Sequence, residues 1–287
     1  MTAVSTRRSG ATALSRTTGH IAIALVGLLM FYPLLWMLSS SFKPVSEIFG
    51  PGSGALIPGS PSLDNYSEGW TGPGLPFTRY LINSLIVCTL TVLGNVLSCS
   101  LAAFAFARMQ FLGRKAFFAA MLATVMLPQH VTLISQYAIF RDLGWLDTYL
   151  PLVVPKFLAT EAFFVFLMVQ FIRGIPRELD EAARIDGCSW WGIYRKIVLP
   201  LLSPALVTTA IFSFIWAYND FLAPLIYISS PEKLTVPLAL RTFLDSSGQS
   251  AWGQLFAMSI VTLIPVVAAF VIFQRRIVEG VSTTGLK

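Results

Sequence analysis

Charged residues are scarce in this sequence, and their scarcity is the first guide to its class. Asp, Glu, Lys and Arg together make up 12% of the 287 residues, whereas hydrophobic residues make up 55% and the mean hydropathy is +0.71. Soluble globular domains carry about 25% charged residues. The composition therefore excludes an ordinary soluble domain and favours a chain embedded in a membrane.

Residues that carry common enzyme chemistry are also few. Cys88, Cys99 and Cys188 form no Cys-x-x-Cys pair, and the two histidines, His20 and His130, stand far apart in the chain. This pattern predicts neither a metal cluster nor a catalytic triad. The sequence also lacks a glycine-rich loop ending in Gly-Lys-Ser or Gly-Lys-Thr, which is the usual cradle for ATP phosphates. We therefore expect no enzyme activity and no bound cofactor in this chain itself.

Long stretches without any charged residue are what the sequence has in abundance. An α-helix needs about 20 apolar residues to cross the hydrocarbon core of a bilayer. Five charge-free stretches are long enough, and a sixth apolar segment is interrupted by Lys156 and Glu161. We expect an all-α polytopic membrane protein whose six transmembrane helices lie at about residues 20–41, 81–107, 116–137, 149–172, 204–228 and 255–274.

Basic residues set the expected orientation, because short loops rich in Lys and Arg tend to stay in the cytoplasm. With a cytoplasmic N-terminus and six spans, most of the 20 basic residues are cytoplasmic, and so are both termini. Residues 1–19 then form an N-terminal arm and residues 20–287 the transmembrane domain. Arg7-Arg8 resembles a twin-arginine start, but the apolar run after it lacks a small-residue cleavage site, which favours an uncleaved span. Since topology explains the net charge of +6, we expect no binding to nucleic acid.

A charged loop between the fourth and fifth predicted spans, residues 174–200, stands out against the apolar background. Pro176 suits the first turn of a helix, and the acidic residues after it lie where the positive end of the helix dipole favours them. Gly187 is a natural stop for this helix. A second short helix is expected to begin with Ser189 as its N-cap and to end at Pro200.

Parts of this loop resemble a known family signature. Glu181-Ala182-Ala183, then Asp186-Gly187, then Ile197-Val198-Leu199-Pro200 resemble the EAA motif of ABC importer permeases. Further segments resemble the carbohydrate-uptake branch, specifically its maltose-type second permease subunit: Tyr32-Pro33-Leu34-Leu35-Trp36-Met37, Ser41-Phe42-Lys43-Pro44, Asn83-Ser84, Tyr218-Asn219-Asp220-Phe221, Gln274-Arg275-Arg276 and Glu279-Gly280. The resemblance covers nearly the whole chain and implies a type I ABC importer permease core in the last five spans. Cys188, where the family usually has Ala, and the tail 281–287 depart from the pattern.

The resemblance implies a heteromeric importer of carbohydrate in a bacterial or archaeal cell membrane. Its partners would be a second homologous permease subunit, an extracytoplasmic solute-binding protein, and two cytoplasmic ATPase subunits that bind ATP and Mg²⁺. In the family the EAA helices seat in a cleft of the ATPase. Carried onto this sequence, the coupling residues are Glu181, Ala182, Ala183, Asp186, Gly187, Leu199 and Pro200. Glu178 and Asp180, by contrast, are expected to face solvent or to compensate the helix dipole.

Polar residues inside the spans are candidates for the transport pathway, because a charge at the bilayer centre costs on the order of 2.5–3.5 kcal/mol. Sugars need hydrogen-bonding groups and aromatic faces. The candidates are Glu161, Trp216, Tyr218, Asn219 and Asp220. Bonding to a neighbouring helix is the alternative interpretation of these residues. The solute stays open among mono-, di- and oligosaccharides and glycerol phosphates.

An autonomous secondary transporter or channel that uses Glu161 and Asp220 is the alternative function. Such a carrier has no need of a docking loop, and the repeat between two halves that many carriers contain is not visible in the sequence. Pro128 and Pro265 interrupt predicted spans, and we expect them to be kinks at which those helices bend.

Overall fold

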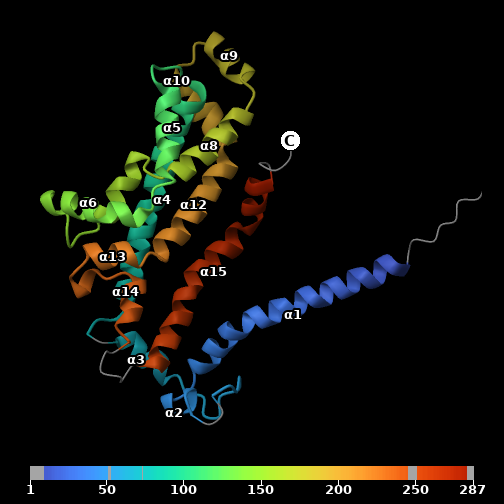
Figure 1. Ribbon diagram of the computed structural model, residues 1–287, viewed down its shortest axis with the longest axis vertical. Helices are drawn as coiled ribbons and strands as arrows, with labels where there is room; N and C mark the ends of the chain where they lie inside the picture. Colours follow the sequence, from blue (N-terminus) through green and yellow to red (C-terminus); the bar gives the residue numbers. More distant parts are fainter. Residues whose placement is uncertain (1–9, 51–52, 73, 245–250, 283–287) are drawn as a thin grey trace, which may run out of the picture. The chain divides into compact units, whose positions relative to one another are not determined.

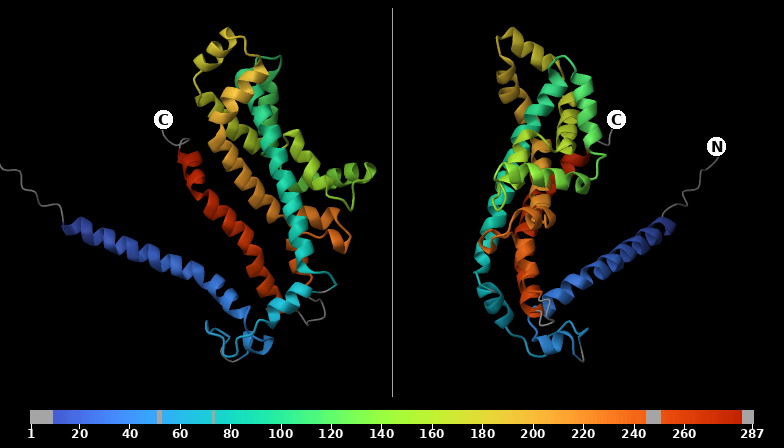
Figure 2. Two further views of the ribbon diagram at one scale, coloured as in Figure 1. Left: turned by 180° about the vertical axis from the view of Figure 1, so that it is seen from behind. Right: turned by 60° about the vertical axis from the view of Figure 1, so that its left-hand side comes forward.

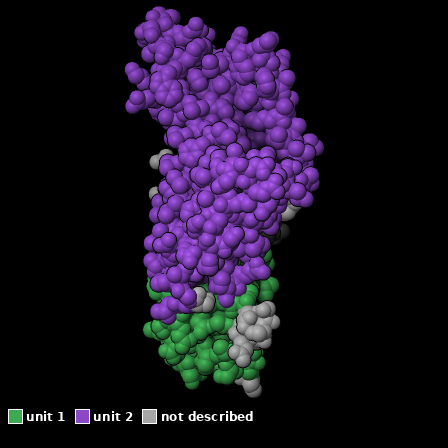
Figure 3. Space-filling model, turned by 90° about the vertical axis from the view of Figure 1, so that its left-hand side faces the viewer, with its two compact units in different colours: residues 1–70, 243–261 green, residues 71–242, 262–287 purple. Residues whose placement is uncertain are grey.

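The computed structural model describes residues 10–50, 53–72, 74–244 and 251–282, and these residues form helices and loops without any strand. The all-α class expected from the sequence is confirmed. The chain divides into two compact units, shown in different colours in Figure 3. Unit 1 comprises residues 1–70 and 243–261, and unit 2 comprises residues 71–242 and 262–287.

Unit 1 contains α1 (Gly10–Ser40), α2 (Val45–Ile48), most of α3 (Asp64–Thr71) and the first part of α15 (Trp252–Ser282). The side chain of Asn65 connects two parts of this unit, because Asn65 Nδ2 donates to the carbonyl oxygens of Ser41 (3.0 Å) and Lys43 (2.8 Å). Lys43 is fully buried, and its Nζ donates to the carbonyl oxygen of Ala55. A Cβ at Gly253 would lie 2.2 Å from Asn65 Oδ1, so only glycine fits there. These contacts order the connection between α1 and α3.

Unit 2 is built on three helices that lie side by side: α4 (Phe77–Arg108), α8 (Ala162–Gly174) and α12 (Ser203–Tyr218) (Figures 1 and 2). Apolar residues of all three form a buried core, which includes Ala103, Phe164, Met168 and Ala205. Small residues in such a core let helix backbones approach closely. Asn95 Nδ2 on α4 donates to Ser213 Oγ on α12 at 3.0 Å, a buried hydrogen bond that joins the two helices.

Shorter elements lie between these three helices in sequence or follow α12. They are α5 (Arg114–Thr124), α6 (Gln129–Asp142), α7 (Leu150–Val153), the 3₁₀ turn η1 (Val154–Leu158), α9 (Glu178–Ile185), α10 (Trp190–Ile193), the π-helix η2 (Tyr194–Val198), α11 (Leu199–Leu201), α13 (Leu222–Tyr227), the 3₁₀ turn η3 (Pro231–Lys233) and α14 (Val236–Arg241).

Asp147 ties the loop after α6 to the segment that precedes α14. Its carboxylate accepts hydrogen bonds from the N–H groups of Ser229 (3.0 Å) and Ser230 (2.9 Å) and from Lys233 Nζ (2.8 Å). These donors, Lys233 first, hold the pKa of Asp147 well below its usual value because they stabilise the charged form. Asp147 itself has φ 57°, a left-handed conformation in which aspartate is enriched.

Four helical stretches of the described residues are long and apolar enough to cross a membrane: Thr17–Ser40, Phe77–Arg108, Leu150–Gly174 and Trp252–Gln274. A fifth is obtained if Trp190–Leu201 and Ser203–Tyr218, which are bent by 75° relative to one another, count as one span. The described residues thus contain several apolar helices of membrane-spanning length.

The segment predicted as the third span, 116–137, is not one continuous helix. α5 ends at Thr124, and α6 begins at Gln129 directly after Pro128, whose backbone is extended. Proline lacks an N–H and disfavours the helical conformation in the residue before it. Pro128 therefore separates two helices, and the expectation of a kink within one helix is wrong there. Pro265 does lie inside a helix, α15.

Candidate functional site

The charged loop folds into two short helical segments. α9 begins at Glu178 and ends at Ile185, and Gly187 follows with φ +80°, a left-handed conformation that glycine adopts without strain. Ser189 is the N-cap of α10, because its Oγ accepts a hydrogen bond from the N–H of Gly192 at 3.3 Å. The stop at Gly187 and the cap at Ser189 that the sequence predicts are both confirmed.

Pro200 does not end the second segment, contrary to expectation. The chain continues from α10 through η2 and α11 as far as Leu201 and only then bends by 75° into α12. Within η2 the N–H of Leu199 bonds to the carbonyl oxygen of Tyr194, five residues back. Proline has no N–H and its ring crowds the carbonyl four residues before it, so this wider turn accommodates Pro200 inside the helix.

α9 has two faces with different surroundings. Asp180 and Ala183 are buried, and Ala183 belongs to the core of unit 2. Glu181, Ala182 and Ile185 are exposed, Ile185 to 86%. Of the other predicted coupling residues, Asp186, Gly187 and Pro200 are exposed, whereas Leu199 is half-buried. The loop therefore anchors itself through one face of α9 and presents the other, and the predicted coupling residues lie mostly on the presented side.

Asp180 is buried in an ion pair, which corrects the expectation that it faces solvent. Its Oδ2 lies 2.9 Å from Nε of Arg108, the last residue of α4, and the two side chains are 9% and 2% exposed. Arg108 Nη2 also donates to the carbonyl oxygen of Ile175 at 2.7 Å. Burial raises the pKa of the Asp180 carboxyl above its ordinary value, and the guanidinium of Arg108 acts in the opposite direction. Sequence reasoning missed the role of Arg108 and counted it only as a topological charge.

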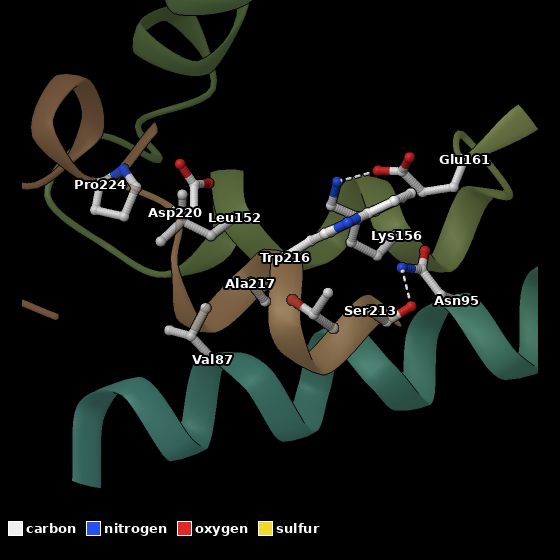
Figure 4. Close-up of a pocket in the computed structure, with 11 residues that line it drawn as sticks. Val87, Asn95, Leu152, Lys156, Glu161, Ser213, Trp216, Ala217, Asp220 and Pro224 are labelled. Atoms are coloured by element: carbon white, nitrogen blue, oxygen red, sulfur yellow. Dashed lines mark hydrogen bonds and ion pairs between the residues drawn. The ribbon is translucent and has the colours of Figure 1, made fainter. Parts of the chain in front are cut away.

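A cavity of about 320 Å³ opens in unit 2 between α4, α12 and the segment that joins α7 to α8 (Figure 4). Its walls are formed by Val87, Thr91, Asn95, Leu152, Lys156, Glu161, Ser213, Trp216, Ala217, Asp220 and Pro224. A second, larger cavity of about 640 Å³ shares Lys156, Glu161, Trp216 and Asp220 with it and extends towards α6. Volumes of this size are typical of small-molecule sites.

Three charged side chains line the cavity. Lys156 Nζ and the Glu161 carboxylate form an ion pair, and Figure 4 shows Asp220 apart from them. Asp220 Oδ1 accepts a hydrogen bond from the N–H of Ala223 at 3.2 Å, so it also caps the start of α13. One amine and two carboxyl groups thus line the cavity, and the amine is paired with one of the two carboxyl groups. The indole of Trp216, a residue 47% exposed, supplies an aromatic surface beside them.

The structure brings three of the five predicted pathway residues to the cavity and places two elsewhere. Tyr218 is buried and its ring stacks on Phe214, with 5.6 Å between ring centroids. Asn219 is exposed, and its Nδ2 donates to the carbonyl oxygen of Ile215 at 2.8 Å. Tyr218 is two residues after Trp216 on α12 and so points to a different side of the helix, whereas Asn219 and Asp220 lie beyond the end of α12. No group of three or more His, Cys, Asp or Glu side chains in the described ranges is arranged to hold a metal ion.

Comparison with known protein families identifies the family of this chain. Residues 94–283 match the family described as binding-protein-dependent transport system inner membrane component. The chain belongs to this family. The permease is 33% identical over 267 residues to the trehalose/maltose transport system permease protein MalG of Thermococcus litoralis, with 93% of this chain and 95% of that protein covered. It is also 33% identical over 268 residues to the arabinooligosaccharides transport system permease protein AraQ of Halalkalibacterium halodurans, with the same coverage.

A solved structure supports the fold assignment. The permease is similar to a chain in the crystal structure of a bacterial ABC transporter that imports the acidic polysaccharide alginate. The TM-score is 0.82 at 20% identity, and the match covers 94% of this chain and 99% of that chain. The expected family and the type I ABC importer permease fold are confirmed, and the permease is a multi-pass membrane protein.

Proposed function

We propose that this permease is the membrane subunit of an ATP-driven importer of carbohydrate and that α9 is its docking element for a separate ATPase. The observation that carries the proposal is the division of α9 into an anchored face, with Asp180 and Ala183, and an exposed face. The exposed face offers a partner an apolar side chain, Ile185, next to the charged Glu181.

Partners of three kinds complete the proposed assembly. A second permease subunit lies beside this chain, two cytoplasmic ATPase subunits bind ATP and Mg²⁺, and an extracytoplasmic binding protein delivers the solute. The family description refers to binding-protein-dependent transport, and a second similar structure is an alginate ABC transporter in complex with an alginate pentasaccharide-bound periplasmic protein. The proposed orientation puts the charged loop and both termini in the cytoplasm, as the distribution of Lys and Arg indicates.

The cavity is the proposed part of the transport pathway that this chain contributes. Named relatives serve trehalose, maltose and arabinooligosaccharides, which favours a carbohydrate here too. Trp216 offers a ring on which a sugar face can stack, and Asn95 and Ser213 offer polar atoms nearby. Lys156 is already paired with Glu161, so the second carboxylate, Asp220, disfavours an anionic solute. A neutral sugar is therefore the proposed solute class, ahead of glycerol phosphates.

A pull-down from solubilised membranes tests the docking role. Wild type is expected to co-purify with an ATPase and a second permease, whereas Glu181→Lys loses the ATPase because it reverses a charge on the exposed face of α9. Glu232→Lys is the matched control, since Glu232 is an exposed acid on η3, away from the charged loop. If wild type purifies alone and moves solute along an ion gradient without ATP, the secondary-transporter alternative replaces this proposal.

A further inference from the structure

The buried pair of Arg108 and Asp180 attaches α9 directly to a helix that is distant from it in sequence. Arg108 is the last residue of α4, and it contacts both Asp180 Oδ2 (2.9 Å) and the carbonyl oxygen of Ile175 (2.7 Å). The guanidinium thus donates one hydrogen bond to the backbone just before α9 and forms an ion pair with a side chain of α9. The pair therefore holds the start of α9 in a defined position against the end of α4.

The middle of the same helix forms a wall of the cavity. Val87, Thr91 and Asn95 of α4 line the cavity, and the helix runs without interruption from Phe77 to Arg108. A rise of about 1.5 Å per residue places Arg108 roughly 20 Å from Asn95 along the helix axis. α4 is thus one continuous helix that extends from the proposed docking element to the proposed pathway.

The burial of both charges makes this attachment stiff. A charge left alone in the interior would be strongly disfavoured, so the two side chains are expected to separate rarely. Asp180 Oδ1 and Arg108 Nε are buried and make no hydrogen bond in the described part of the chain, so Asp180 is held mainly by its charge attraction to Arg108. Movement of α9 without Arg108 would leave both charges unpaired.

We propose that Arg108 and Asp180 are positioning residues that make α9 and α4 move as one body, so that a displacement of the docking element reaches the cavity wall. The inference rests on the proposed docking of α9 to the ATPase. It assigns the pair a role in transmission that is separate from forming the docking surface, because both side chains are buried and neither is available to a partner.

The test uses the assembled importer in nanodiscs or proteoliposomes, with its ATPase subunits, second permease and binding protein. Asp180→Asn removes the charge but keeps the shape of the side chain. It is expected to retain the ATPase and its basal hydrolysis, while solute moved per ATP falls about tenfold, the scale of a typical coupling energy. Asp142→Asn is the control, since it breaks the exposed pair of Arg141 and Asp142 (2.9 Å) and should leave coupling unchanged.

A second variant separates transmission from folding. Arg108→Met with Asp180→Leu replaces both buried charges by apolar side chains, an exchange that often preserves or improves stability. This variant is expected to assemble and melt like wild type yet to stay uncoupled. Full coupling in it would show that the pair serves folding alone and would overturn the inference.

A distance measurement gives a readout that a purely structural role would not change. Spin labels on exposed positions of the two helices, Leu179 on α9 and Leu93 on α4, should keep one distance in the nucleotide-free and ATP-bound states of wild type. In Asp180→Asn the distance should differ between the states. A state-dependent distance in wild type would refute rigid attachment, and so would loss of the ATPase from Asp180→Asn. Absence of the ATPase from wild type would instead refute the proposed function itself.

Discussion

Gly94 of α4 packs tightly against η1, and replacing it should push the cavity wall apart. A Cβ at this position would lie 2.9 Å from a ring carbon of Phe157 and 3.0 Å from the backbone carbonyl carbon of Lys156. Ser98, one turn further along α4, donates its hydroxyl to the carbonyl oxygen of the same Lys156 at 2.7 Å. Gly94→Ala therefore strains the contact that holds the Lys156 segment against α4.

The size of the effect follows from packing. One methyl group forced into a filled site costs about 1–3 kcal/mol. The upper end applies to Gly94 because a backbone atom, unlike the ring of Phe157, cannot rotate aside. Alanine has a higher helix propensity than glycine, which offsets about 1 kcal/mol of this cost. The net loss is about 2 kcal/mol, which corresponds to a melting temperature lower by about 4–8 °C.

Thermal melting of the purified permease measures this loss, and uptake kinetics of the reconstituted importer measure its effect on the cavity. Gly27→Ala on α1 is the matched control, because a Cβ at Gly27 would have no neighbour within 4 Å in the described part of the chain. We expect Gly94→Ala to melt lower and to import more slowly than Gly27→Ala. Equal melting and equal uptake of the two variants would refute the close approach of α4 to η1.

Three further predictions concern other parts of the chain. Asp147→Asn should speed hydrogen exchange of the Ser230 amide at neutral pH. The folded-state pKa of Asp147 is depressed, so its carboxylate stabilises the folded protein above the unfolded-state pKa, and this stabilisation is lost only as the pH falls through the folded-state pKa. Exchange in the variant and in wild type should therefore converge in strong acid. Ser189→Ala should lower stability by about 1 kcal/mol in the same melting assay through loss of the N-cap, and unchanged melting would contradict the cap. Asp220→Asn and Glu161→Gln should each raise the KM for uptake without loss of partner subunits, and wild-type kinetics in both would remove the cavity from the pathway.

Local features of the charged loop were predictable because they depend on neighbouring residues alone. A serine cap and a glycine in the left-handed conformation have the same physical cause in any context, and Ser189 and Gly187 behave accordingly. The partner of Asp180 was not predictable, because Arg108 is far away in sequence. An arginine that ends an apolar stretch looks the same whether it faces the membrane interface or a buried carboxylate.

Tertiary packing also decided which polar residues reach the cavity. Trp216 and Asp220 differ by four positions and share a wall, whereas Tyr218 and Asn219, between them, do not. Asp220 follows the end of α12 at Tyr218, so helical periodicity does not predict that grouping. Asn95 was missed for the same reason: an amide within an apolar stretch gives no indication of its partner, Ser213.

Several helices connect the charged loop to the cavity, and α4 is best suited to transmit movement because it is the stiffest of them. The route through α11 into α12 bends by 75° around Leu202, and the route through α8 meets the cavity only beyond its N-terminal end, where Glu161 precedes the first helical residue. α4 has no proline in its 32 residues and reaches from Arg108 to the cavity as a single helix. A bent or interrupted helix absorbs displacement at its break, whereas an unbroken one passes it on. The attachment of α9 to this particular helix is therefore the contact whose loss should cost the most coupling for the least change in the docking surface.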